Sequence, residues 1–112
     1  MFSVVIPAYN CSKIICRSIE SVLAQTVQSF EIVIVNDGST DDLSSTMDMY
    51  EDTRIKVIDQ QNKGVSIARN TGIQNASYPW ICFLDADDAW MPEHLSTLKL
   101  MMQDYPEMEV FA

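Results

Sequence analysis

The sequence predicts an α/β domain built on a Rossmann-like, mostly parallel sheet with helices on both faces. Two observations support this fold class: strand-like and helix-like segments alternate along the chain, and the strand-like segments are almost continuously apolar. Continuous apolar strands are typical of parallel sheets, because helices cover both faces of such a sheet. At 112 residues the chain has room for one domain, so residues 1–112 are treated as a single unit.

The first half of the chain predicts two strands, each followed by a helix. Phe2 to Pro7 is a short apolar run, and Phe30 to Val35 is a β-branched run that turn-forming residues close. Ser12 can cap the helix after the first strand, and Thr40 or Asp41 can cap the more polar helix after the second. The first helix is expected because apolar residues recur with helical spacing, at Ile14, Ile15, Ile19, Val22 and Leu23.

The second half repeats the alternation. Ile55 to Ile58 and Trp80 to Leu84 are expected strands, and Val65 to Asn75 is the expected helix between them. The buried side of that helix is expected to carry Ile67, Ala68 and Ile73. Pro92 is favourable in a first helical turn, so a last helix is expected from there, and Pro106 would end it.

Charge and composition exclude several classes of partner. Seven basic residues stand against sixteen acidic ones, a formal net charge of −9, and a surface of that sign repels nucleic acid and anionic lipid. The sequence shows no signal-peptide pattern and no apolar run long enough to cross a bilayer, so membrane association is not evident. The three cysteines form no Cys-x-x-Cys pair, which favours a reduced, cytoplasmic compartment.

Polar motifs follow three of the expected strands. They are Pro7-Ala8-Tyr9-Asn10, Asn36-Asp37-Gly38-Ser39 and Asp85-Ala86-Asp87-Asp88. The carboxyl ends of parallel strands meet at one edge of the sheet, which is where such sheets bind their ligands. The sequence therefore predicts that these three loops converge on one rim.

The acidic run Asp85-Ala86-Asp87-Asp88 is the most informative of the three motifs. Carboxylates at the end of a buried strand repel one another unless a cation lies among them. A hard divalent ion with oxygen ligands, shared with substrate phosphates, is the expected occupant. With an extended backbone, Asp85 and Asp87 would point to one side and Asp88 away from them. A solvated acidic loop is the alternative, which the buried strand before the run makes less attractive.

Three further side chains are candidates for ligand contacts, and each has an ordinary structural alternative. Tyr9 can stack on a planar base or simply cover the sheet edge. Asp37 can accept hydrogen bonds from a nucleobase or a ribose hydroxyl, or it can form an Asx turn. Lys63 or Arg69 can neutralise phosphate oxygens or hold the acidic run in place, and a surface salt bridge is the alternative.

Six blocks of sequence together match a known pattern in order and spacing, although each block alone is weak. They are Val4 to Asn10, Ser18 to Thr26, Phe30 to Asp41, Asn62 to Gly64, Ala68 to Gly72 and Phe83 to Asp88. With these blocks, the chain resembles the N-terminal, nucleotide-sugar-binding half of a family 2 glycosyltransferase of the GT-A fold. The resemblance covers nearly the whole chain.

The resemblance implies a nucleotide-sugar donor, most often a UDP-sugar, and a glycan or other hydroxyl acceptor. It places Tyr9 against the uracil and Asp37 on the base, and it matches a D-x-D element to Asp85-Ala86-Asp87. Within that element, Asp87 would bind Mn²⁺ or Mg²⁺ bridging the diphosphate, and Asp85 would lie near the ribose or donor sugar. The implied nucleotide-sugar-binding residues are Pro7, Ala8, Tyr9, Asp37, Gly64, Arg69, Asp85 and Ala86, and the implied metal ligands are Asp87 and Asp85.

The chain departs from this family in length. Such a catalytic domain usually runs to about twice this size, and its second half supplies the acceptor surface and a carboxylate general base. No match for that base appears before Ala112, so a truncated domain with the donor and metal site alone is expected. Val110-Phe111-Ala112 resembles the start of another strand. The last helix and this strand are expected to leave an apolar edge of the sheet uncovered, where a second copy of the chain can associate to form a homo-oligomer. Segments absent here can also attach the protein peripherally to the inner membrane face.

Other α/β classes fit the sequence less well. A non-enzymatic nucleotide-binding or flavodoxin-like receiver module suits the length and the alternation. A receiver, however, needs an acidic pair after its first strand, where this chain has Pro7-Ala8-Tyr9-Asn10. A dehydrogenase would carry G-x-G-x-x-G at that place. A haloacid-dehalogenase-like phosphatase would have its D-x-D after the first strand, whereas here it follows the fourth.

Overall fold

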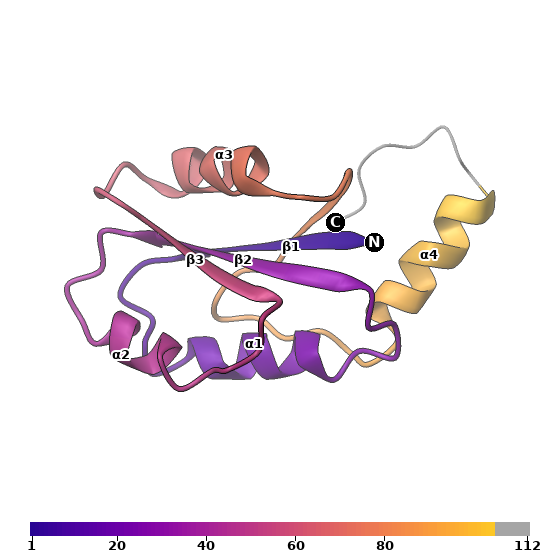
Figure 1. The fold of residues 1–112 in the computed structure, drawn as a ribbon, viewed down its shortest axis with the longest axis horizontal. Coiled ribbons are helices and arrows are strands. Elements are labelled where there is room, and N and C mark those ends of the chain that lie inside the picture. The colour runs from indigo at the N-terminus through magenta and orange to yellow at the C-terminus, as the bar shows by residue number, and fades with distance from the viewer. Residues whose placement is uncertain (105–112) are drawn as a thin grey trace.

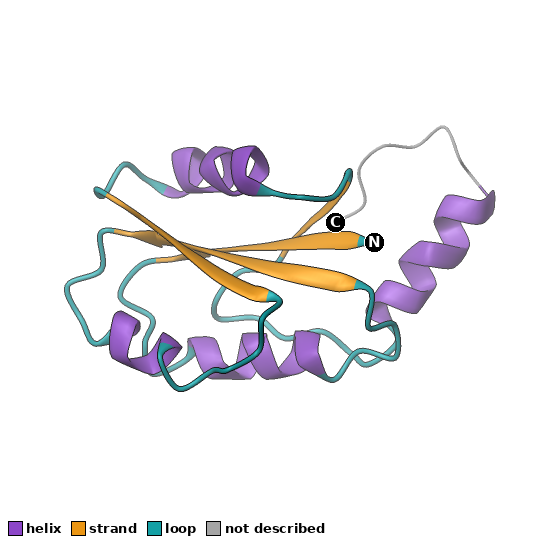
Figure 2. Cartoon of the chain, viewed as in Figure 1, coloured by secondary structure: helices purple, strands orange, loops and turns teal. Residues whose placement is uncertain are grey.

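The computed structural model describes residues 1–104, which form a four-stranded sheet with helices on both of its faces (Figures 1 and 2). The strands are β1 (Phe2–Ala8), β2 (Phe30–Asp37), β3 (Ile55–Gln60) and β4 (Trp80–Phe83). The helices are α1 (Ile15–Leu23), α2 (Leu43–Met47), α3 (Val65–Asn75) and α4 (His94–Asp104). Every strand pairing is parallel, so the predicted fold class is confirmed.

The strand order is β3-β2-β1-β4. Strand order distinguishes the two common kinds of doubly wound sheet. Rossmann sheets place their strands in the order 3-2-1-4, whereas flavodoxin-like receivers place strand 1 between strands 2 and 3. Here β3 lies outside β2, and β1 pairs with β2 and β4. The receiver-like alternative considered from the sequence is therefore wrong.

The parallel register sets the three polar motifs at one edge of the sheet. Ala8, at the end of β1, pairs with Asn36 in β2, so these two strands end level with each other. β4 pairs only with the first part of β1, where Phe83 lies opposite Val5. The chain then continues along β1, because the N–H of Leu84 donates to the carbonyl of Val5 at 3.0 Å. The acidic run therefore begins beside the end of β1.

The two faces of the sheet carry different helices (Figure 1). α1 and α2 cover one face, where a large apolar cluster includes Ile15, Ile19, Ile32 and Leu43. α3 covers the other face and contacts β1 and β2. On that side the core is small, and it consists of Val5, Val33, Val35 and Ala68. α4 adds its buried Leu95 and Leu98 to the larger cluster.

Three predictions about the first half differ from the structure. Ser12 does not cap α1 through its side chain; the N–H of Ser12 instead donates to Asp41 Oδ2 at 3.0 Å. Ile14 is 49% exposed because it lies in the turn before the helix begins, and Ile15 takes the buried position. The N-cap position of α2 is Asp42, not Thr40 or Asp41 as predicted, although Asp41 Oδ1 accepts the N–H of Leu43 at 3.2 Å.

α3 has the predicted bounds but a different buried side. Ile67 and Ile73 are exposed, and the buried residues are Ala68 and Gly72. The cause is a close approach of the helix to the sheet: a Cβ placed on Gly72 would lie 2.3 Å from Cγ1 of Val5. Only small residues fit at this contact, so the larger isoleucines lie on the outer side.

Two expectations lie partly or wholly outside the described residues. Pro106, the expected end of α4, and the expected strand at residues 110–112 fall outside residues 1–104.

Among residues 1–104, no helix has both the length and the apolar character needed to cross a bilayer. Cys11, Cys16 and Cys82 are all free thiols, and burial raises the pKa of Cys82 to about 12.

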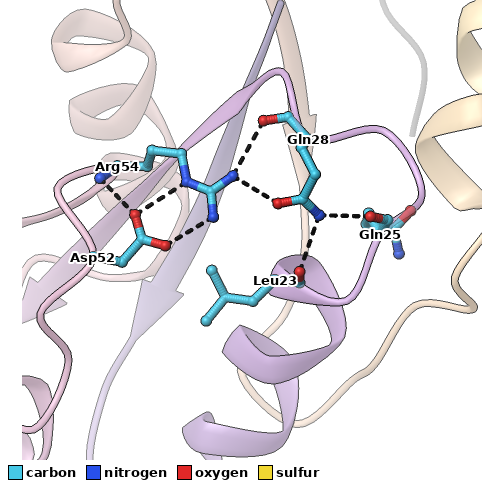
Figure 3. Close-up of polar contacts among 5 residues, drawn as sticks. All are labelled: Leu23, Gln25, Gln28, Asp52 and Arg54. Carbon is cyan, nitrogen blue, oxygen red and sulfur yellow. Dashed lines mark hydrogen bonds and ion pairs between the residues drawn. The ribbon is translucent and has the colours of Figure 1, made fainter.

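Arg54 joins three segments at the amino ends of the strands (Figure 3). Its guanidinium donates to both carboxylate oxygens of Asp52 at 2.8 and 3.0 Å, and to the main-chain and side-chain oxygens of Gln28 at 3.1 and 2.9 Å. It also lies 4.3 Å from the centre of the Phe30 ring. Gln28 in turn donates to the carbonyls of Leu23 and Gln25. The cluster thus ties the end of α1 to the start of β3.

We expect the Asp52–Arg54 pair to make stability depend on acid pH. Hydrogen bonds from Arg54 lower the pKa of Asp52 from 3.8 to about 2. Between these values the unfolded chain binds more protons than the folded chain, so stability falls as pH drops from about 4 to about 2. Urea unfolding at about pH 5 and about pH 2.5 measures this loss, which Asp52→Asn should reduce. Asp48→Asn, at an exposed carboxylate, is the matched control. The same pH dependence in Asp52→Asn and wild type would contradict the assignment.

Candidate functional site

A pocket of about 240 Å³ lies at the carboxyl ends of β1 and β2. Its lining residues come from the loop after β1, the end of β2, the loop after β3 and the start of α3: Pro7, Ala8, Tyr9, Asp37, Asn62, Gly64, Val65 and Ala68. Five of these eight were predicted as site residues from the sequence. Asn62, Val65 and Ala68 were not, because nothing in an isolated sequence shows that the start of α3 faces the end of β2.

Asp37 lies at the base of this pocket and is 4% exposed. Its Oδ1 accepts hydrogen bonds from Gln60 Nε2 at 2.9 Å and the N–H of Lys63 at 2.8 Å, and its Oδ2 accepts from the N–H of Gly64 at 3.0 Å. Burial raises the pKa of this carboxyl, but the three hydrogen bonds outweigh burial, so the pKa lies below its ordinary value. A carboxylate accepts about four hydrogen bonds. One acceptor position, on Oδ2, therefore remains for a ligand.

The loop after β3 approaches the end of β2 very closely. A Cβ on Gly38 would lie 2.6 Å from the main-chain nitrogen of Asn62, and the φ of Gly38 is +71°. Asn62 Nδ2 also donates to the carbonyl of Asp37 at 3.2 Å. Gly64, with a φ of +96°, turns the chain into α3. Lys63 was proposed from the sequence for its side chain, yet its main-chain N–H is the group that contacts Asp37.

Tyr9 lies at the mouth of the pocket and is 52% exposed, so its ring is accessible to a ligand. The adjacent loop is fixed by hydrogen bonds to the loop after β2. The N–H of Asn10 donates to Ser39 Oγ at 3.0 Å, and the N–H of Thr40 donates to Asn10 Oδ1 at 2.8 Å. The first two polar motifs are thus brought together as predicted.

The acidic run forms a compact turn with its carboxylates gathered. Asp85, Asp87 and Asp88 are exposed, and each offers a carboxylate oxygen that lies within 4.8 Å of those of the other two. The expectation that Asp88 points away is wrong, because the backbone is not extended: the N–H of Asp88 donates to the carbonyl of Asp85 at 3.0 Å. Three carboxylates with only oxygen donors fit a hard divalent cation such as Mn²⁺ or Mg²⁺.

Arg69 of α3 contacts the acidic turn. It follows the pocket-lining Ala68 on α3, and its Nη2 lies 3.3 Å from Asp85 Oδ1. Its guanidinium also lies 5.9 Å from the centre of the Phe83 ring. The structure shows the predicted contact with the acidic run as an ion pair whose side chains are 40% and 51% exposed, which also fits the surface salt bridge given as the alternative. The Nε of Arg69 is buried without a hydrogen-bond partner among the described residues.

Ala86 occupies a different place from the other predicted site residues. It is 9% exposed and belongs to the large apolar cluster on the α1 side of the sheet. Its carbonyl accepts a hydrogen bond from Ser18 Oγ at 2.7 Å. Ser18 was not predicted as a site residue. Its position between Ile15 and Ile19, on the apolar side of the helix, is visible in the sequence and indicates a buried serine that needs a hydrogen-bond partner.

Comparison with known proteins gives consistent results. The family model described as Glycosyl transferase family 2 matches residues 3–111. An uncharacterized glycosyltransferase of Rickettsia felis is 43% identical over 103 residues, which cover 91% of this chain and 17% of that protein. The crystal structure of residues 1–349 of Staphylococcus aureus TarS in complex with UDP-GlcNAc superposes with a TM-score of 0.87 at 29% identity, over 94% of this chain and 32% of that chain.

A more distant structure shares the fold. The mannosyltransferase PcManGT from Pyrobaculum calidifontis, solved in complex with GDP-Man and Mn²⁺, superposes with a TM-score of 0.84 at 22% identity. The present chain covers 32% of the PcManGT chain. In each of these comparisons the present chain spans at most a third of the other protein's length.

Proposed function

The chain belongs to glycosyl transferase family 2, and from this premise we propose that it forms the donor and metal site for metal-dependent transfer of a sugar from a UDP-sugar to a hydroxyl acceptor. The observation that carries the proposal is the shared edge of the sheet. A pocket with one free carboxylate acceptor and a cluster of three carboxylates lie there, and Arg69 of α3 contacts the cluster. The TarS likeness supports a nucleotide-sugar ligand, since that structure holds UDP-GlcNAc.

In this proposal the pocket binds the nucleoside. The exposed Tyr9 ring stacks on the base, and stacking on an aromatic ring is worth about 1–3 kcal/mol per base. The remaining lone pair of Asp37 accepts the imide N–H of uracil. Pro7, Ala8 and Gly64 line the pocket, and the absence of a side chain on Gly64 lets the ligand approach the backbone.

The acidic turn holds the metal in this proposal. Asp87 and Asp85 are the proposed ligands, and the structure adds Asp88 as a third carboxylate within reach. A bound Mn²⁺ or Mg²⁺ supplies charge stabilisation for the diphosphate leaving group. Arg69 is held beside Asp85 and contributes a further positive charge at the same edge. We assign no general base within this chain, and we place the acceptor surface in the additional sequence that its longer relatives possess.

Calorimetry tests the donor and metal assignment. Titration of UDP in the presence of Mn²⁺ should release heat with the wild-type chain, and Asp87→Ala should weaken this metal-dependent binding by tenfold or more, on the order of the loss of one metal ligand. Glu51→Ala removes an exposed carboxylate from the turn before β3 and serves as the matched control, with unchanged affinity expected. If Asp87→Ala binds UDP and Mn²⁺ as tightly as wild type does, the donor-site assignment is wrong.

A further inference from the structure

α1 and the segment directly after it carry a row of polar side chains on their buried side. Ser18 is 0% exposed and Gln25 is 2% exposed, and the half-buried Ser21 lies between them. Ser18 and Ser21 are three positions apart on α1, so they lie on the same side of the helix. Gln25 follows the end of the helix and continues the row, because its Nε2 donates to the carbonyl of Ser21 at 3.0 Å. Buried polar groups are nearly always hydrogen-bonded, and the partners of this row reveal what it does.

Ser18 faces the main chain of the acidic turn. Its Oγ lies 2.7 Å from the carbonyl oxygen of Ala86 and 3.2 Å from that of Asp85, and it also contacts the carbonyl oxygen of Asp88. A hydroxyl has a single proton, so it donates to one of these three carbonyls at a time. Rotation of the hydroxyl therefore keeps a hydrogen bond to the turn when the turn shifts slightly.

The rest of the row binds the segment that follows the turn. Ser21 Oγ accepts the N–H of Trp90 at 3.1 Å. Gln25 donates from Nε2 to the carbonyl of Met91 at 2.7 Å and accepts the N–H of Leu95 at its Oε1 at 2.9 Å. These bonds reach main-chain atoms, so the row fixes the path of the backbone from residue 85 to residue 95.

The main-chain carbonyls and the carboxylates of the acidic turn have different surroundings. Three of its carbonyls point inward to Ser18, whereas the carboxylates of Asp85, Asp87 and Asp88 are exposed. The carboxylate oxygens lie within 4.8 Å of one another where the backbone is folded back between Asp85 and Asp88. The side chain that holds the carbonyls therefore also sets the spacing of the carboxylates.

We propose that Ser18 is a positioning residue for the metal site. From α1, its hydroxyl holds the Asp85–Asp88 turn in the conformation that brings the three carboxylates together. The inference rests on the proposed function, in which this turn binds a divalent cation. Without the hydroxyl, the carbonyl of Ala86 loses its buried donor and only the bond between the N–H of Asp88 and the carbonyl of Asp85 still holds the turn, so the turn loosens and its carboxylates move apart. Loss of a group that orients metal ligands typically weakens metal binding by about 10–100-fold.

The test is a titration of Mn²⁺ alone into the chain, with free Mn²⁺ followed by electron paramagnetic resonance. Ser18→Ala should weaken Mn²⁺ binding by about 10–100-fold under conditions where the variant is folded. The matched control is Ser3→Ala, because Ser3 is also 0% exposed and hydrogen-bonded, to Glu31 and to the N–H of Tyr78, but lies at the amino end of β1. Ser3→Ala should destabilise the fold yet leave Mn²⁺ affinity unchanged. Equal Mn²⁺ affinity in Ser18→Ala and wild type would overturn the proposal.

Two further measurements keep the outcome decisive. If Ser18→Ala does not fold, Ser18→Cys replaces it, because a thiol has a similar shape but is a weak donor; wild-type affinity in this variant would overturn the proposal. Amide exchange of residues 85–91 without metal should be faster in the Ser18 variant than in wild type and Ser3→Ala. Failure of the wild-type chain to bind Mn²⁺ would refute the proposed metal site, and the exchange rates would still show whether Ser18 holds the turn.

Discussion

Asp37→Asn is expected to weaken UDP binding at least a hundredfold and to lower the free energy of unfolding by about 2–3 kcal/mol. The carboxylate accepts hydrogen bonds on both oxygens, from Gln60 Nε2 and from the N–H groups of Lys63 and Gly64. An asparagine amide has one oxygen and one NH₂ group. At least one main-chain donor of the loop would therefore face another donor, and the loop that forms one wall of the pocket would lose its attachment.

UDP titration calorimetry and urea unfolding at neutral pH measure the two effects. Asp59→Asn is the matched control, because Asp59 is a nearby carboxylate in β3 that accepts a hydrogen bond from a side chain, Asn36 Nδ2 at 3.0 Å. An amide oxygen can replace that acceptor, so little change is expected. If Asp37→Asn retains wild-type affinity for UDP, Asp37 does not contact the base.

Gly72→Ala is expected to destabilise the fold by about 1–3 kcal/mol, the usual cost of overpacking a core. The added Cβ would lie 2.3 Å from Cγ1 of Val5, which is completely buried at the centre of β1. Backbone or side chain must move to relieve this contact. α3 also carries Ala68 and Arg69, so its displacement should widen the pocket and weaken UDP binding as well.

A double-mutant cycle separates this clash from other effects of the substitution. Val5→Ala removes the methyl groups that the new Cβ meets, so the double variant should lose less stability than the sum of the two single variants. Gln74→Ala, at an exposed position of α3, is the control for a change in helix propensity. Additive losses in the double variant would show that the two side chains do not collide.

The strands and the meeting of the loops after β1 and β2 could be predicted from the sequence. Apolar runs such as Phe30 to Val35 mark strands directly, and the parallel order that they imply brings the ends of β1 and β2 to one edge. The place of Asp37 at this edge, at the end of β2, follows from the strand order. These features depend on local pattern and topology, which are visible in one chain.

The remaining features depend on tertiary contacts that a pattern does not show. Asp88 joins the other carboxylates because the turn folds back, and the turn is held by Ser18 from a helix 67 to 70 residues earlier. Ile67 is exposed because α3 lies so close to β1 that only small residues fit between them. The main-chain N–H of Lys63 contacts Asp37, and side-chain chemistry gives no sign of such a role.

The Arg54 cluster has a practical consequence for engineering the chain. It lies at the amino ends of the strands, and the pocket and the acidic turn lie at the opposite ends, so the two regions are separated by the length of the sheet. Enzymes often lose turnover when they are made more heat-resistant, since both properties draw on the same residues. Here heat resistance can be improved around Arg54 without touching the proposed nucleotide-binding residues, so the two properties can be optimised separately.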